Sequence, residues 1–165
     1  MTFEIDARLQ GELLGVAWMI GHWEGAGHSR QPSGEDQQFA VTLDFAENGG
    51  NYLHHIMQWF TTDEVGRPVK SLGMETGFWR PKPDGDIEVV IAHPLGIAEV
   101  YLGKIEGAKI EMRTDVVART ITAETPVTGG HRLYGNVDSD LMFALDRGTS
   151  DHEMQPYLWA RLTRS

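Results

Sequence analysis

The sequence predicts an all-β protein whose antiparallel strands form a closed barrel or a sandwich, with one short helix near the N-terminus. Short strand-like runs alternate with turn residues at fairly even intervals along the chain. No long helical period lies between these runs, which excludes parallel strands joined by crossover helices. The chain has 165 residues, of which 41% are hydrophobic, and this size suits one core. We therefore expect a single domain that covers residues 1–165.

The helix is predicted within the first twenty residues. Leu9, Leu13 and Ala17 recur at four-residue spacing, and Asp6 is a residue type that commonly caps a helix N-terminus. Gly15 weakens the pattern, so we expect the helix to be short.

The clearest strand runs from Phe39 to Phe45, where large apolar residues occupy every second position. Turn residues end it, and similar turn signals separate the segments that follow. We interpret Gly129-Gly130 as a loop and residues 106–108 as the turn of a hairpin. About eight to ten strands are expected in all. Besides the clearest one, strands are predicted at residues 52–60, 76–80, 87–92, 97–102, 116–122, 132–134, 141–145 and 157–163.

Composition excludes several functional classes. The net charge is −10 and no Lys/Arg cluster is present, which argues against binding to duplex nucleic acid or to an anionic membrane. The chain has no cysteine, so disulfide scaffolds, thiolate zinc sites, iron–sulfur clusters and cysteine nucleophiles are excluded. The acidic start lacks the order of a signal peptide, and the longest apolar stretch is too short to cross a bilayer. We expect a cytoplasmic protein.

Known catalytic and metal motifs are also absent from the sequence. It contains no G-x-S-x-G elbow, no phosphate loop and no H-E-x-x-H pattern, and its acidic residues are scattered. We therefore assign no catalytic residues and expect no metal site.

A glycine-rich block, Gly21-His22-Trp23-Glu24-Gly25-Ala26-Gly27, has the form G-x-W-x-G-x-G. In a small barrel such a tryptophan can plug the closed end, while the glycines let the chain bend close to its neighbours. Together with later blocks in the same order, it resembles the nitrobindin family over nearly the whole chain. The later blocks are Glu75–Arg80, Glu88–Glu99, Arg132–Tyr134, Leu141–Leu145 and Pro156–Arg164.

The resemblance implies both a fold and an activity. The fold would be a closed ten-stranded antiparallel barrel, related in shape to lipocalins and fatty-acid-binding proteins. Nitrobindins hold ferric haem b in the barrel mouth, bind nitric oxide and isomerise peroxynitrite to nitrate. One histidine on the last strand holds the iron in that family.

This sequence departs from the family at the residue that holds the iron. When Leu158, Ala160 and Leu162 are matched to the family's last strand, Tyr157 takes the place of the ligating histidine. Arg147 falls where many relatives have an apolar residue that faces the haem, often methionine, and a buried charge there is costly unless it is paired. We therefore expect that histidine ligation has been lost and that no cofactor is bound.

Haem b is the alternative cofactor. A tyrosinate can hold ferric haem if a nearby cation, such as Arg161 or Arg147, favours the phenolate of Tyr157. The nearest histidine is His152, which we place in a loop before the last strand. The simpler interpretation of Tyr157 is an aromatic residue that lines the pocket.

Four residues are candidates for lining the barrel lumen, namely Arg147, His54, His55 and Trp159. His54 and His55 are adjacent, so a strand directs them to opposite faces and one of them can face the lumen. His93 precedes a Pro-Leu-Gly segment, and we interpret it as a turn histidine bonded to the backbone.

Three functions follow from these observations. The first is a barrel that binds an unknown small molecule in its lumen, where Arg147 and Tyr157 would suit an anionic head group such as a carboxylate. The second is a ferric haem protein that isomerises peroxynitrite, with Tyr157 or another residue on the iron. The third is a barrel with a filled lumen and a structural or partner-binding role. A monomer and a homodimer are both compatible with the sequence.

Overall fold

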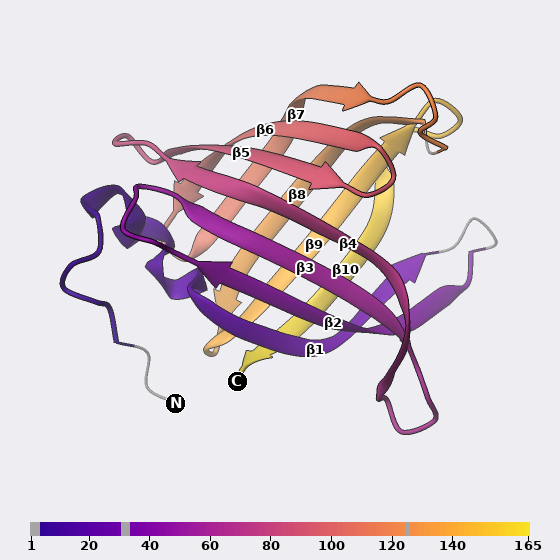
Figure 1. The fold of residues 1–165 in the computed structure, drawn as a ribbon, viewed down its shortest axis with the longest axis horizontal. Coiled ribbons are helices and arrows are strands. Elements are labelled where there is room, and N and C mark those ends of the chain that lie inside the picture. The colour runs from indigo at the N-terminus through magenta and orange to yellow at the C-terminus, as the bar shows by residue number, and fades with distance from the viewer. Residues whose placement is uncertain (1–3, 31–33, 125) are drawn as a thin grey trace.

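A computed structural model describes residues 4–30, 34–124 and 126–165, and its ten antiparallel strands close into one barrel (Figure 1). Each strand pairs with the next along the chain, and β1 pairs with β10 to complete the circle. The closed ten-stranded barrel expected from the sequence is therefore confirmed. Its elements are a 3₁₀ helix, η1 (Gly11–Met19), and the strands β1 (Gly21–Arg30), β2 (Asp36–Ala46), β3 (Leu53–Thr62), β4 (Pro68–Pro81), β5 (Asp86–His93), β6 (Ile97–Glu106), β7 (Lys109–Arg119), β8 (Val127–Val137), β9 (Asp140–Thr149) and β10 (Gln155–Arg164).

Side-chain alternation fills the barrel interior. On β2, Phe39, Val41, Leu43 and Phe45 are buried while the residues between them are partly exposed. The same two-residue period continues around the barrel and gathers the inward side chains of every strand into one core cluster.

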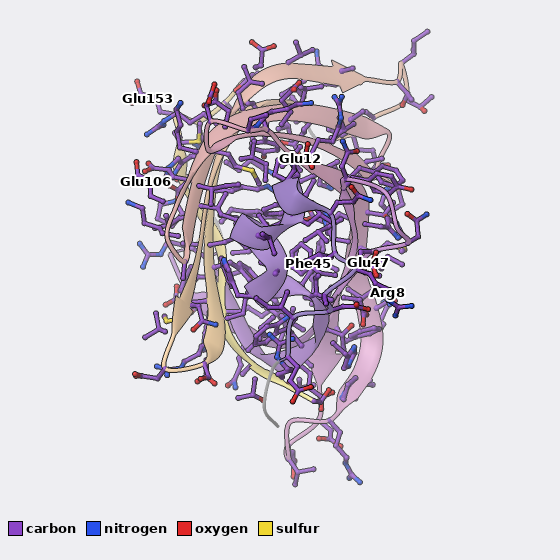
Figure 2. All side chains as sticks on the ribbon, turned by 90° about the vertical axis from the view of Figure 1, so that its left-hand side faces the viewer. Arg8, Glu12, Phe45, Glu47, Glu106 and Glu153 are labelled. Atoms are coloured by element: carbon purple, nitrogen blue, oxygen red, sulfur yellow. The ribbon has the colours of Figure 1, made fainter. Side chains whose placement is uncertain are left out.

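Helix η1 closes one end of the barrel, and Figure 2 looks onto that end. Leu13, Val16 and Met19 are fully buried there. The helix differs from the expected one because it is a 3₁₀ helix that begins only at Gly11, after Gln10, which makes no side-chain cap bond. Asp6 instead accepts hydrogen bonds from the backbone and side chain of Arg8.

The glycine-rich block joins η1 to the barrel. The Trp23 side chain is fully buried and its indole Nε1 donates to the carbonyl of Met19 at 2.7 Å. The Arg164 guanidinium lies 4.1 Å from the centre of the Trp23 ring system. A Cβ atom on Gly27 would lie 2.6 Å from the Phe39 ring, so this position must lack a side chain. The block therefore fills the end of the barrel that η1 closes, as its sequence suggests.

Most strands extend beyond the ranges expected from the sequence, and two expectations differ further. The strand expected at 116–122 is the last part of β7 and ends at Arg119. Gly129-Gly130, which we expected in a loop, lies within β8. A Cβ atom on Gly130 would approach the Tyr101 hydroxyl to 2.4 Å, so the glycine reflects close packing against the interior rather than a chain break.

The other end of the barrel, where β9 ends and β10 begins, is its mouth. Among the residues that the structure describes, no helix is long and apolar enough to cross a membrane.

Candidate functional site

A pocket of about 370 Å³ opens at the mouth, between the last residues of β1 and β9 and the first residues of β2 and β10. This volume lies at the lower end of the range found for small-molecule sites. Its lining combines apolar and polar side chains: Ser29, Arg30, Gln37, Phe39, Trp59, Leu72, Arg147, Thr149, His152, Gln155, Pro156, Tyr157 and Leu158.

Tyr157 reaches this pocket because β10 is irregular at its start. The pairing of β10 with β9 shifts between Pro156 and Leu158, and both Tyr157 and Leu158 line the pocket. Regular alternation would turn one of two consecutive side chains away. Tyr157 is half-buried and packs against the core cluster.

Arg147 lies directly over Tyr157. Its guanidinium carbon is 3.9 Å from the centre of the Tyr157 ring, a cation–π contact. Within residues 4–30, 34–124 and 126–165, no carboxylate comes within ion-pair distance of Arg147, whereas Arg30 in the same pocket faces Asp36 at 3.4 Å. The pocket therefore presents a cation whose charge no described acidic side chain balances.

The remaining predicted lumen residues separate into two groups. His55 points into the barrel and is buried, whereas its neighbour His54 instead lies on the outer face, stacked on Phe78 and 2.7 Å from the Thr76 hydroxyl. Trp159 also lies on the outer face, stacked on His28 with ring centres 5.9 Å apart. Alternation along β10 gives the physical reason, since Leu158 and Ala160 on either side of Trp159 are the buried residues.

His152, treated in the sequence only as a loop histidine, lines the mouth pocket together with Tyr157 and Arg147. Its loop folds back because the His152 backbone N–H donates to the Thr149 hydroxyl at 3.1 Å. The Thr149 N–H in turn donates to the His152 carbonyl at 2.9 Å.

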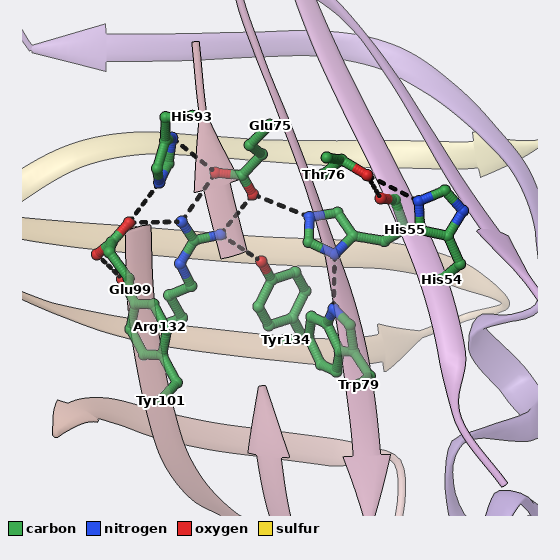
Figure 3. A network of polar contacts seen from close by, with 10 residues as sticks. All are labelled: His54, His55, Glu75, Thr76, Trp79, His93, Glu99, Tyr101, Arg132 and Tyr134. Carbon is green, nitrogen blue, oxygen red and sulfur yellow. Dashed lines mark hydrogen bonds and ion pairs between the residues drawn. The ribbon is translucent and has the colours of Figure 1, made fainter. Parts of the chain in front are cut away.

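The barrel interior contains a second group of polar residues, of which only His55 was expected in the lumen from the sequence. We call Glu75, Arg132, Glu99, His93 and His55 the buried ionic cluster; Figure 3 shows it from close by. All five side chains are at most 3% exposed. They come from β4, β8, β6, β5 and β3, so the cluster ties five strands together across the lumen.

Arg132 is the centre of this cluster. Its Nη1 donates to Glu75 Oε1 at 2.6 Å and its Nη2 donates to Glu75 Oε2 at 2.9 Å, a two-pronged ion pair. Nη2 also lies 3.7 Å from Glu99 Oε1, and Nη1 donates to the Tyr134 hydroxyl at 3.1 Å. The Tyr101 hydroxyl donates to the other oxygen of Glu99 at 2.6 Å.

His93 belongs to the same cluster, which corrects the interpretation of it as a turn histidine bonded to backbone. Its Nε2 is 2.5 Å from Glu99 Oε1 and its Nδ1 is 3.7 Å from Glu75 Oε2. The turn does begin here, since the Gly96 N–H donates to the His93 carbonyl. The imidazole, however, points into the barrel because His93 continues the inward series of Val89 and Ile91 on β5.

The cluster keeps both carboxylates ionised. Burial by itself would raise the pKa of Glu75, but the charge and hydrogen bonds of Arg132 hold that pKa well below its ordinary value. Burial likewise opposes the charge on Glu99, and the contacts of His93 and Arg132 nevertheless lower its pKa. Burial would also lower the pKa of Arg132, yet the Glu75 carboxylate raises it well above its ordinary value.

A closed barrel with a ligand-sized pocket at one mouth is the architecture of the small-ligand-binding β-barrels. The family model described as "THAP4-like, heme-binding beta-barrel domain" matches residues 12–164. The chain belongs to this family, and its resemblance to the nitrobindins is confirmed.

Similar proteins carry two different names. A "Ferric nitrobindin-like protein" of Cutibacterium acnes is 52% identical over 166 residues, covering 100% of both chains. A "Peroxynitrite isomerase" of Nocardioides sp. is 40% identical, with 99% of each chain covered. The crystal structure of Rv2717c from M. tuberculosis superposes with a TM-score of 0.81 at 28% identity, covering 95% of this chain and 99% of that one.

Proposed function

We propose that this barrel binds a small molecule with an anionic head group at its mouth, in place of a histidine-ligated haem. The observation that carries the proposal is the Arg147 guanidinium, stacked 3.9 Å over the Tyr157 ring and without a carboxylate partner among the described residues. An anionic head group would balance the positive charge of Arg147. Phe39, Trp59 and Leu158 supply an apolar wall for the rest of the ligand.

The residues at the mouth do not fit a haem held by the family's histidine. In this proposal Tyr157 is the counterpart of that histidine, and the Arg147 guanidinium covers one face of the Tyr157 ring. An apolar macrocycle in this pocket would have to desolvate the Arg147 guanidinium, which has no carboxylate partner among the described residues, and desolvating an unpaired charge is costly. We therefore derive no reaction step that passes through haem.

The wild-type protein is expected to form no tight one-to-one complex when it is titrated with ferric haem and the Soret band is recorded. Tyr157→His alone restores a ligand but leaves the Arg147 charge, so we expect Tyr157→His with Arg147→Met to be needed for a stoichiometric, spectrally shifted complex. Trp159→His is the matched control, because it places a histidine two residues along on the outer face.

A second candidate function, a ferric haem protein that isomerises peroxynitrite, is favoured by one observation. His152 lines the same pocket and is a residue type that binds haem iron. If the wild type gives a stoichiometric Soret shift, our first proposal is wrong. His152→Ala and Tyr157→Phe then identify the ligand, because only loss of the true ligand abolishes the shift.

Binding of decanoate and decanol, measured by calorimetry, tests the anionic head group directly. Decanoate is expected to bind about tenfold or more tightly than decanol, since a hydrogen bond to a charged group contributes about 1.5–3 kcal/mol. Arg147→Gln should remove this preference and leave the weaker affinity for decanol unchanged. Arg161→Gln is the control, as Arg161 is paired with Asp140 on the outer face. Equal binding of the two compounds to the wild type would contradict the proposal.

A further inference from the structure

The charges within the barrel do not balance if only the permanently charged groups are counted. Apart from the phenols of Tyr101 and Tyr134, the ionisable side chains buried in the described residues are Glu75, Glu99, Arg132, His55 and His93. Both carboxylates are ionised and face one guanidinium, which leaves one negative charge without compensation. Uncompensated charge in a protein interior is strongly unfavourable, so one of the two histidines is expected to carry a proton.

His55 is not that histidine. The Trp79 indole Nε1 donates to His55 Nδ1 at 2.8 Å, and an indole N–H can only donate. His55 Nδ1 must therefore be an unprotonated acceptor, while Nε2 carries the hydrogen and faces Glu75 Oε1 at 3.3 Å. Burial also lowers the pKa of His55, in keeping with a neutral ring.

His93 has the opposite environment, because each of its ring nitrogens faces a carboxylate oxygen. Nε2 lies 2.5 Å from Glu99 on β6, and Nδ1 lies 3.7 Å from Glu75 on β4. A neutral imidazole would present a lone pair to one of these oxygens, whereas an imidazolium presents an N–H to both.

The other groups around His93 do not supply the missing charge. The Arg132 guanidinium from β8 is already counted, and β7 contributes only Ile110 and Met112 as buried residues. The two phenols stay neutral, since burial raises the pKa of Tyr134 to about 12 and that of Tyr101 still further.

We propose that the barrel interior is a proton-binding site, in which His93 holds a proton as an imidazolium between Glu99 and Glu75 and so makes the buried ionic cluster neutral. An imidazolium that is held in the folded protein, but is neutral in the unfolded chain at pH 7.5, makes folding take up one proton. The folding equilibrium constant then falls as the pH rises, by up to tenfold per pH unit.

Nitrogen-15 NMR of the histidine rings in the intact protein tests the proposal without any substitution. At pH 7.5 we expect both ring nitrogens of His93 to be protonated, and His55 to show one protonated nitrogen, Nε2. An unprotonated ring nitrogen on His93 at this pH would overturn the proposal.

The pH dependence of unfolding supplies a second test. Between pH 7 and 8.5, the folding equilibrium constant of the wild type should fall with rising pH more steeply than that of His93→Gln. The difference between the two slopes should correspond to one proton per molecule. His54→Gln is the matched control, because it removes the adjacent outward histidine and should keep the wild-type slope. Equal slopes for the wild type and His93→Gln would contradict a proton held by His93. If His93→Gln does not fold, Glu99→Gln takes its place. Glu75 and Arg132 then balance each other, so His93 should show one unprotonated ring nitrogen at pH 7.5 in that variant.

Discussion

Replacement of Arg132 by methionine is expected to lower the free energy of unfolding by about 3–5 kcal/mol, measured by urea denaturation with tryptophan fluorescence. The guanidinium makes both hydrogen bonds to Glu75 and lies 3.7 Å from Glu99, and it is 3% exposed. Methionine replaces the apolar stem of Arg132 but not its charge, so it would leave two buried carboxylates facing each other with only His93 between them. The loss therefore comes from uncompensated charge rather than from a cavity.

Two further variants separate these causes. Arg113→Met removes an exposed arginine of β7 whose carboxylate partner is 3.9 Å away, and it should change stability by less than about 0.5 kcal/mol. The double variant Glu75→Met with Arg132→Met removes both members of the ion pair and leaves His93 with Glu99. It should be more stable than Arg132→Met alone, because removing one partner of a buried pair costs more than replacing both. A double variant less stable than the single one would refute this explanation.

Replacement of Trp23 by alanine is expected to cost about 3–5 kcal/mol. The side chain is fully buried beneath η1, donates to the Met19 carbonyl and lies under the Arg164 guanidinium. Its removal would leave a cavity between the helix and the barrel and would free Met19 from its hydrogen bond. Thermal and urea unfolding measure the loss.

The matched control for this prediction is Trp159→Ala on the outer face, where the indole is only partly covered and stacks on His28. We expect its effect to be much smaller, since most of the lost surface was already in contact with water. Trp23→Phe should give an intermediate loss, because the ring is largely kept while the hydrogen bond is removed. If the two alanine variants were equally destabilised, the burial of Trp23 beneath η1 would not explain the loss of stability in Trp23→Ala.

The mouth and the interior differ in how far the sequence could predict them. Tyr157 on β10 and Arg147 on β9 were singled out through the resemblance to the nitrobindins, and the structure brings the two into contact at one pocket. His152 joins them only through the fold of its loop, which no motif marks. Trp159 could not be placed from the sequence, since the irregular start of β10 decides which side chains face inward.

The buried ionic cluster was harder still to predict from the sequence. Glu75 occupies an inward position on β4 in line with Trp79, and such an acid within an apolar series was a signal that strand alternation could have revealed. Its partner Arg132 lies 57 residues away in sequence and reaches it across the lumen. No local pattern encodes that meeting.

The sequence by itself determined the strand periodicity, the glycine-rich block and the absence of thiolate chemistry. These features are local, because they depend on residue types and on spacings of two to seven positions. The tertiary structure alone decided which charges share the interior, which histidine has a carboxylate at each ring nitrogen and where the unbalanced cation of the mouth lies. Those properties depend on distances between strands far apart in the chain, and barrel closure is what sets these distances.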